Sequence, residues 1–393
     1  MKRIKRAVLF AAIVCGVLAA GCGTTHMERK RAEAQERWAL SRVQMAVKLA
    51  EGCYKRGELG LARQHIEEGI KTGASYAPLY ILAARLAAEN GELDTARHYA
   101  ETARATDPDS PEACYVLGTI EQALDHADRA LEAFSEAVRL NPDRPAYVLA
   151  EAELLADQGR IEQAAERLSD AAGRMPGQAQ VHAALADILC LLDRYEEAAG
   201  SYRIALRLDP RQKSVKEHLA TALFFSGDYA AAEPLLADLA AAEPAFATEG
   251  ILKMRGDCLL ALGRLDEAQT LFRRLLAADP TSAATRVGLA KCDILADRLD
   301  VSRKHLEAAL AQAPEHAEAN ALMGYVLMEA GRPGEAVSHL RLALEAPDCA
   351  DREAVERLLA RAGAAGSRPE PSGGGLRVSR PGGGTITEVF KRD

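Results

Sequence analysis

One stretch decides the fold of this chain: residues 115–143, which read YVLGTIEQALDHADRALEAFSEAVRLNPD. Two helical segments meet at Asp125, with a small residue, Ala130, five positions after the turn and Pro142 seventeen after it. The pattern returns nine times, and seven of the eight intervals between turns are 34 residues; the turn residues are Gly57, Gly91, Asp125, Gly159, Asp193, Gly227, Gly263, Asp297 and Gly331. This period indicates stacked helical hairpins. In such repeat proteins the functional site is more often a binding surface than a catalytic pocket.

Each recurring residue type has a physical reason. Gly or Asp between two helices accepts a left-handed backbone at little steric cost. One small residue five positions after the turn and another seven before it let the two helices approach closely. Proline cannot continue a helix and separates one hairpin from the next. Bulky side chains keep one register in the second helix and are expected to fill the space between hairpins: Phe134, Tyr202, Leu236, Phe272, Leu306 and Leu340.

This pattern resembles the tetratricopeptide repeat (TPR). The resemblance covers residues 43–350, which hold nine units of 34 residues and a two-residue insertion between Gly227 and Gly263. Repeats one and nine depart from it, since Ala74 replaces the usual proline and Pro347 comes one position early. Such departures are expected of terminal repeats, whose outer faces meet water. The resemblance implies an all-α, right-handed superhelical solenoid of nine hairpins.

Three further segments flank the repeats. Residues 28–42 are charged and predict a lead helix that continues into the first repeat. Residues 351–362, DREAVERLLARA, place apolar side chains at helical spacing and predict a cap helix. Residues 363–393 are rich in Gly, Pro and Ser and predict a disordered tail. Its end, TITEVF at 385–390, could add as a strand to a partner's sheet; the alternative is a tail without a specific role.

The N-terminus predicts a membrane address. Residues 1–21 combine a basic start with an apolar run of signal-peptide length, too short to span a bilayer. The sequence LAAGC at 18–22 resembles the bacterial lipobox, although Ala19 stands where that family usually has Leu. The resemblance implies cleavage before Cys22, a lipid on its sulfur, a tether over 22–27 and a place at the bacterial envelope. Glycine after the cysteine favours the outer membrane, facing the periplasm. The alternative is a plain cleaved secretory signal.

Charge excludes one class of partner. Without residues 1–21, which hold four basic residues and no acid, the chain keeps 45 basic and 57 acidic residues, a net charge of −12. Such a surface as a whole repels nucleic acid and anionic headgroups, and no basic stripe stands out against it. We therefore expect no nucleic-acid binding.

The sequence favours no catalytic, metal or cofactor site. The nine histidines are scattered, and none has the spacing of a catalytic triad. His305 and His339 share one register on successive second helices. We therefore expect them to lie one above the other along the outer face of the solenoid and not to bind a metal ion together. Cys258 and Cys292 occupy one register in adjacent repeats, about 10 Å apart by helix packing. A disulfide needs Cα atoms within ~7 Å. We therefore expect Cys258 and Cys292 to form no disulfide and to pack as small buried hydrophobic residues. Neither an enzyme nor a small-molecule substrate is predicted.

The resemblance implies a concave groove lined by the first helix of each hairpin. An apolar series through Val47, Ile81, Tyr115 and Leu149 predicts a hydrophobic trough for an amphipathic helix or an extended peptide. The alternative is that these side chains pack between helices. The Lys and Asn that clamp C-terminal carboxylates in chaperone-binding members are missing. The candidate partner-binding residues are Val47, Glu51, Tyr54, Ile81, Arg85, Tyr115, Thr119, Leu149, Glu153 and Asp187.

Together these features predict a membrane-anchored scaffold that binds a protein or peptide client. Residues 57–118 are similar to TPR lipoproteins that assist secretin assembly in type IV pili, which implies an assembly factor for an envelope secretion or pilus machine. The alternative is a structural adaptor that docks cell-wall or exopolysaccharide enzymes.

Overall fold

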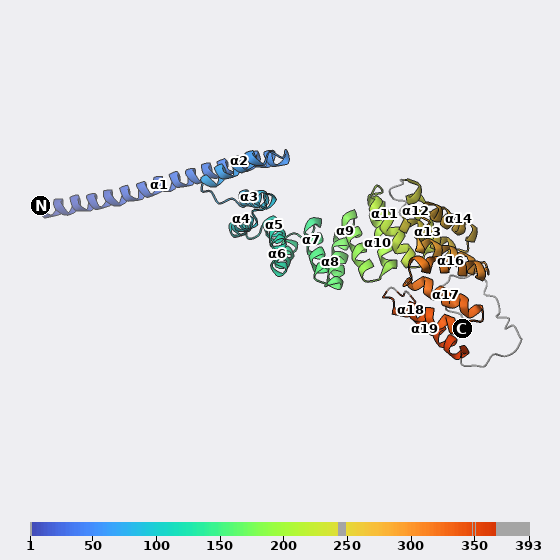
Figure 1. Ribbon diagram of the computed structural model, residues 1–393. Coiled ribbons are helices and arrows are strands. Elements are labelled where there is room, and N and C mark those ends of the chain that lie inside the picture. The colour runs from blue at the N-terminus through green and yellow to red at the C-terminus, as the bar shows by residue number, and fades with distance from the viewer. Residues whose placement is uncertain (1, 243–248, 348, 350, 367–393) are drawn as a thin grey trace. The chain divides into compact units, whose positions relative to one another are not determined.

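A computed structural model describes residues 2–242, 249–347, 349 and 351–366 of the 393-residue chain. For residues 2–25 only the backbone is described. Every regular element in these ranges is an α-helix, and Figure 1 labels them in chain order.

Odd-numbered helices are the first members of successive hairpins and even-numbered helices the second, with α19 left over at the end. Their bounds are α1 (Lys2–Lys55), α2 (Leu59–Lys71), α3 (Ala77–Glu89), α4 (Leu93–Thr106), α5 (Pro111–Ala123), α6 (Ala127–Leu140), α7 (Pro145–Asp157), α8 (Ile161–Arg174), α9 (Ala179–Leu191), α10 (Tyr195–Leu208), α11 (Lys213–Phe225), α12 (Tyr229–Ala242), α13 (Glu249–Ala261), α14 (Leu265–Ala278), α15 (Ala283–Leu295), α16 (Leu299–Gln312), α17 (Ala317–Glu329), α18 (Pro333–Glu345) and α19 (Arg352–Gly366).

The chain forms two compact units, Met1–Ile188 and Leu189–Asp393. In the first unit α1 packs on α2, α3 on α4, α5 on α6 and α7 on α8, and α2, α4 and α6 also contact the hairpin that follows. In the second unit the same holds from α10 to α19. First helices touch each other directly, α3 with α5 in the first unit and α13 with α15 in the second. Neighbouring first helices can therefore build a shared surface within each unit.

The turns between the helices of a hairpin are left-handed, as predicted. All nine predicted turn residues have positive φ, from 56° at Asp193 to 82° at Gly227. Asp125 and Asp297 adopt this region at 61° and 59° although they carry side chains. Asp tolerates the conformation better than most residues, because its short polar side chain can bond locally.

The small residues are buried inside the hairpins, as predicted, but the bulky residues expected between hairpins also fill space within their own hairpin. The nine small residues five positions after each turn are completely buried. A Cβ built on Gly118 would lie 2.6 Å from the ring of Phe134, and one on Gly256 would lie 2.3 Å from the ring of Phe272. Glycine, which has no side chain, therefore leaves room for these phenylalanine rings.

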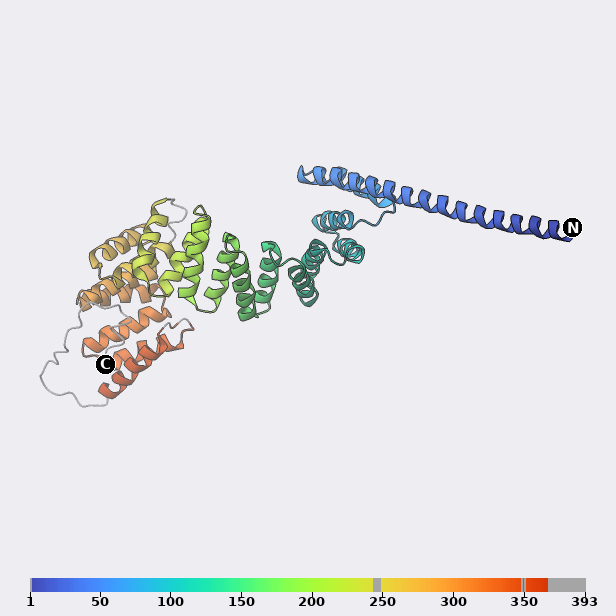
Figure 2. The same cartoon turned by 180° about the vertical axis from the view of Figure 1, so that it is seen from behind.

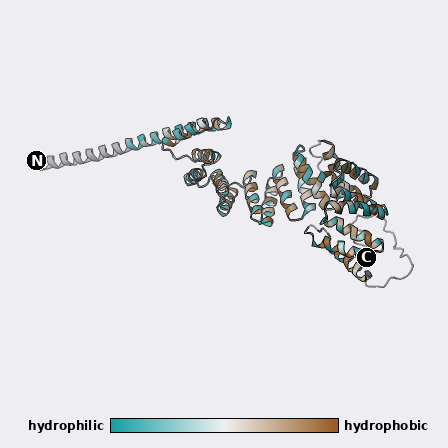
Figure 3. Cartoon of the chain, in the orientation of Figure 1, coloured by the Kyte–Doolittle hydropathy of each residue, from teal (hydrophilic) through white to brown (hydrophobic). Residues whose placement is uncertain are grey.

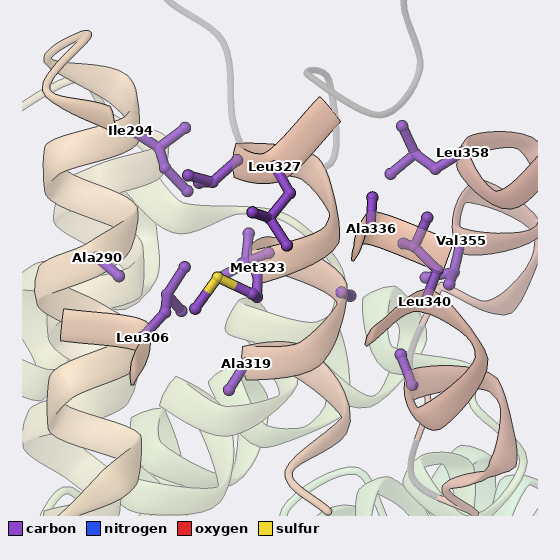
Figure 4. Close-up of a cluster of buried hydrophobic side chains, with 14 of the residues drawn as sticks. Ala290, Ile294, Leu306, Ala319, Met323, Leu327, Ala336, Leu340, Val355 and Leu358 are labelled. Carbon is purple, nitrogen blue, oxygen red and sulfur yellow. The ribbon is translucent and has the colours of Figure 1, made fainter. Parts of the chain in front are cut away.

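The C-terminal hairpins share one core with the last helix. Figure 4 shows Met323 and Leu327 of α17 directed toward Leu306 and Ile294 of the preceding hairpin. On the other side of α17–α18, Val355 and Leu358 of α19 join the same cluster. Helix α19 thus covers the last repeat where a further hairpin would otherwise stack.

The first helix is longer than one repeat requires. Helix α1 is unbroken from Lys2 to Lys55, so it runs through the predicted tether 22–27 and lead helix 28–42 into the first hairpin (Figure 2). The predicted boundaries around Cys22 stay predictions. Where Figure 3 colours α1, the helix is first hydrophilic and becomes mixed near α2. Within the described residues, no helix has both the length and the apolarity needed to span a membrane. The predicted disordered tail began at residue 363, but α19 extends to Gly366. The two-residue insertion, residues 367–393 and their TITEVF segment lie outside the described residues.

Candidate functional site

A cavity of about 290 Å³ opens within the first unit. Its volume lies at the bottom of the range of about 300–1,000 Å³ that small-molecule pockets occupy. A cavity of this size suits one large side chain of a bound peptide better than a cofactor. Helices α3, α5 and α7 and the connection before α7 supply its lining, which consists of Arg85, Glu112, Tyr115, Asn141, Arg144, Ala146 and Tyr147.

An ion pair joins two of the first helices at this cavity. The Arg85 guanidinium of α3 donates to the Glu112 carboxylate of α5 at 2.8 Å. The two side chains are 39% and 49% exposed, so the pair adds little to stability. Its role is to fix a charged edge beside the cavity.

Aromatic side chains form the apolar part of the lining. The Tyr115 ring lies 5.1 Å from that of Tyr147, centre to centre, at an interplanar angle of 39°, and 5.8 Å from that of Phe134. Tilted arrangements at these distances are favourable for aromatic pairs. Burial raises the pKa of the Tyr147 hydroxyl, which keeps it protonated near neutral pH. Tyr115 stays half-buried and can offer its ring to a ligand.

Arg144 occupies a position that would normally stabilise a helix. It is the N-cap of α7 and makes no capping side-chain bond. At the same place one repeat earlier, the Ser110 hydroxyl accepts from the Ala113 N–H at 3.3 Å and caps α5. Within the described residues the exposed Arg144 guanidinium forms no ion pair. The planar guanidinium is therefore available to a carboxylate, which it can bind through two parallel N–H bonds.

The structure brings two of the predicted groove residues, Arg85 and Tyr115, to the cavity. It places two others in the core: Val47 is only 4% exposed and Ile81 only 6%. Val47 packs with Leu79 of the next hairpin, so the expected continuous apolar trough does not include these two positions, and packing is their role. The physical reason is that first helices contact each other along this face.

The remaining predicted groove residues are accessible, and their binding role stays a prediction. Leu149 and Tyr54 are half-buried, and the Tyr54 hydroxyl donates to the Glu89 carboxylate. The Thr119 hydroxyl donates to the Tyr115 carbonyl within α5, at 3.0 Å. Glu51, Glu153 and Asp187 are exposed.

Three lining residues that were not predicted from the sequence lie in the connection before α7 and in the first turn of that helix. Asn141, Arg144 and Tyr147 belong to the stretch NPDRPAY, which corresponds to DPDSPEA one repeat earlier. Tyr147 thus stands in the register of Ala113, a position that takes a small residue there. The difference between NPDRPAY and DPDSPEA at equivalent positions is the sequence signal that could have indicated the cavity.

A second constellation lies in the second unit. The Lys291 ammonium of α15 donates to Asp257 of α13 at 3.1 Å and to Glu318 of α17. Burial by itself would lower the pKa of Lys291, but the attraction of Asp257 and Glu318 outweighs it and holds the pKa above its usual value. Burial would likewise raise the pKa of Glu318, yet Lys291 keeps it lowered. This network, in which Lys291 is buried and the Glu318 side chain is 38% exposed, ties three first helices together.

The cysteines of the described residues carry free thiols. Cys258 and Cys292 are buried, as predicted, and burial raises the pKa of each thiol to about 12. A thiol with so high a pKa is a poor nucleophile and metal ligand. The described part of the chain also holds no group of three or more His, Cys, Asp and Glu side chains suited to a metal ion.

Comparison with solved structures gives relatives in fold. The chain is 18% identical to a chain in the structure of Naa15/Naa10 bound to HypK-THB, with a TM-score of 0.44, covering 82% of this chain and 51% of that one. It is 22% identical to YrrB, a TPR protein with an unusual peptide-binding site, with a TM-score of 0.41, covering 48% and 96%. It is 20% identical to pilF of Pseudomonas aeruginosa, with a TM-score of 0.41, covering 53% and 94%. No curated protein matches the chain.

Family models give the assignment. One model, described as tetratricopeptide repeat, matches residues 87–154, 122–188, 259–305 and 302–362, which together make up more than half of the chain. A second model with the same description matches residues 215–238. With its nine left-handed turns and buried small residues, the chain belongs to the tetratricopeptide repeat family.

Proposed function

We propose that this protein is a membrane-anchored scaffold that holds a segment of a client protein at the cavity of the first unit. One observation carries the proposal: the Arg144 guanidinium, which forms no ion pair with any residue that the structure describes, lines the same cavity as the Tyr115–Tyr147 pair. Arginine and tyrosine are the residues that most often dominate protein interfaces. The arrangement suits an acidic side chain next to a large apolar one in the client.

The chemistry of the cavity supports binding without catalysis. Arg85 is held by Glu112, and the raised pKa of Tyr147 keeps its hydroxyl a hydrogen-bond donor and not a base. A client carboxylate can take two parallel N–H bonds from Arg144. Its neighbouring side chain can then lie against the rings of Tyr115 and Tyr147. These contacts give affinity and register to an extended or helical segment.

The place of action is proposed from the N-terminal sequence. LAAGC at 18–22 supports a lipid on Cys22 and an address at the outer membrane, facing the periplasm. The likeness of residues 57–118 to lipoproteins that assist secretin assembly supports a role as an assembly factor for a pilus or secretion machine. An adaptor for cell-wall or exopolysaccharide enzymes would use the outer, second helices instead.

Photo-crosslinking tests the binding site. A benzophenone amino acid at Tyr115 should capture a defined client in intact cells, whereas the same group at Glu132, exposed on α6, should not. Capture only from Glu132 would contradict the cavity and favour the adaptor. For the captured client, Arg144→Glu should raise Kd at least about ten-fold, or 1.4 kcal/mol. Arg129→Glu, the same charge change on exposed α6, is the matched control and should leave Kd unchanged.

A double substitution tests the same surface more severely. Tyr115→Glu with Leu149→Glu places two charges at half-buried positions and should abolish recovery of the client while the helical content is kept. Undiminished recovery would refute the site. The anchor has its own test: Cys22→Ser should abolish incorporation of a labelled fatty acid, and unchanged labelling would refute acylation at Cys22.

A further inference from the structure

One face of α1 exposes large apolar side chains to water. Met27 is 56% exposed, Trp38 63%, Met45 58% and Leu49 47%. Their spacings of 11, 7 and 4 residues bring all four to one side of a helix with 3.6 residues per turn. Val43, on a different face of α1, is buried against the first repeat. The exposed stripe is therefore separate from the core face.

The charges of α1 are sorted around this stripe. At about 100° per residue, Arg31 and Arg42 fall within roughly 40° of Trp38, and no carboxylate shares that sector. Glu33 and Glu36 fall about 140–160° away, on the opposite side. The Arg42 guanidinium lies over the Trp38 ring, 4.8 Å from its centre. The face is thus both apolar and cationic.

These charges decide between possible occupants. Two copies of the same face would bring arginine against arginine, which disfavours self-pairing. An anionic lipid surface complements the face instead, since Trp and Arg are well suited to the boundary between headgroups and acyl chains. The lead helix 28–42 carries five basic and three acidic residues, opposite in sign to the chain as a whole. Met27 follows Cys22, the expected lipid attachment site, by only five residues.

We propose that α1 lies along an anionic membrane surface through Met27, Trp38, Met45 and Leu49, with Arg31 and Arg42 contacting lipid phosphates. The inference rests on the anchoring proposed above and adds a second contact to it. With an acyl group as the sole contact, the repeats would be free to rotate relative to the membrane about the lipid attachment site. A helix held flat on the bilayer fixes the direction in which the first hairpin leaves the membrane.

Trp38 provides the measurement, because it is the only tryptophan in the chain. The purified full chain is reconstituted into vesicles of phosphatidylcholine with phosphatidylglycerol. Trp38 emission should shift to the blue, be quenched by lipids brominated on their acyl chains and be shielded from acrylamide. In vesicles of phosphatidylcholine alone, the emission should remain that of an exposed indole. Equal spectra in both kinds of vesicle, with full access to acrylamide, would overturn the proposal.

Paired variants test the face. Arg31→Glu with Arg42→Glu should weaken docking by about five-fold for each arginine, the contribution of one basic residue near an anionic surface. Arg29→Glu with Arg37→Glu makes the same change in net charge away from the stripe and should keep most of the quenching. Equal losses in the two variants would show that overall charge, and not this face, attracts the helix. Each variant is compared between the two vesicle types, because removing Arg42 also changes the surroundings of Trp38.

The two proposals fail separately. Mass spectrometry of the peptide containing Cys22 reports the lipid, and Trp38 emission reports α1. An acylated Cys22 with an exposed Trp38 overturns the helix contact alone. An unmodified Cys22 with Trp38 quenched by brominated lipid overturns the anchor alone.

Discussion

The two units use one repeat position in opposite ways. Arg85 in the first unit and Lys291 in the second each lie six residues before the turn of their hairpin, and each pairs with a glutamate 27 residues further on. The Arg85 side chain is 39% exposed and meets one carboxylate, Glu112. The Lys291 side chain is 11% exposed and meets two, Asp257 and Glu318. The Arg85–Glu112 pair borders a cavity, whereas Lys291, Asp257 and Glu318 form an ion-pair network that connects three helices.

Neighbouring side chains account for the difference. Tyr115 lines the cavity beside Arg85, while the residue in the same register beside Lys291 is Ala321, which is buried and offers no aromatic wall. Asp257 bonds Lys291 from the preceding hairpin, whereas its counterpart before Arg85, Glu51, is exposed. The same hairpin backbone can therefore form either a binding surface or an ion-pair network between helices. Which of the two forms depends on residues at positions that the repeat pattern does not specify.

The largest effect is expected from Lys291→Met. It leaves Asp257 and Glu318 close together without their cation, and breaking a buried ion pair in this way costs about 3 kcal/mol. Denaturant unfolding should show the loss, and hydrogen exchange should locate it in α13, α15 and α17. Client binding at the first unit should not change. Lys304→Met, an exposed lysine on α16, is the control; a similar loss there would contradict the network.

Next come Gly118→Ala and Gly256→Ala, which place a methyl group against Phe134 and Phe272. Overpacking costs about 1–3 kcal/mol, and the better helix propensity of alanine returns up to about 1 kcal/mol. Both variants should melt earlier. Because Phe134 touches the Tyr115 ring, only Gly118→Ala should also weaken client binding.

Gly256→Ala serves as the control for that coupling, since its phenylalanine lies in the other unit. If both glycine variants weaken client binding equally, the contact between Phe134 and Tyr115 does not position the cavity.

Acid should weaken the network of Lys291, Asp257 and Glu318. The pKa of Glu318 is lowered in the folded state from its usual 4.5, so its contribution is present above pH 4.5 and is lost as the pH falls through the folded value. The pKa of Lys291 is raised from 10.5, so its contribution is present below pH 10.5 and is lost only at more alkaline pH. Hydrogen exchange of α15 and α17 is followed from pH 7 down to pH 3, and the protection of their amides relative to the intrinsic exchange rate at each pH should fall at the acid end. Glu318→Gln should remove the part of this acid response that Glu318 contributes; an unchanged response would contradict the assignment.

The smallest effect, and one of opposite sign, is expected from Arg144→Ser. Serine can cap α7 as Ser110 caps α5, which should stabilise the first unit by about 0.5–1 kcal/mol. The same change removes the cation from the cavity and should weaken client binding. Thermal unfolding and the Kd of the client measure the two effects. A gain in stability with unchanged Kd would show that Arg144 takes no part in binding.

The geometry of each hairpin could be predicted from residue types and their spacing. Left-handed turns at Asp125 and Asp297, and the space that Gly118 leaves for Phe134, follow from residue types at fixed spacing. These requirements are local, because they concern backbone angles and volumes within one repeat, and repetition makes them visible nine times over.

Which side chains are available to a partner depends on the packing between hairpins. Periodicity assigned Val47 and Tyr115 to one face, but packing against the next hairpin buried Val47 and left Tyr115 half-open. Arg144 lines the cavity from the connection before α7 and Tyr147 from the first turn of α7, and the 34-residue pattern marks neither position. The outcome depends on how first helices of successive hairpins lie against each other through space, which the spacing of residues along one chain does not specify.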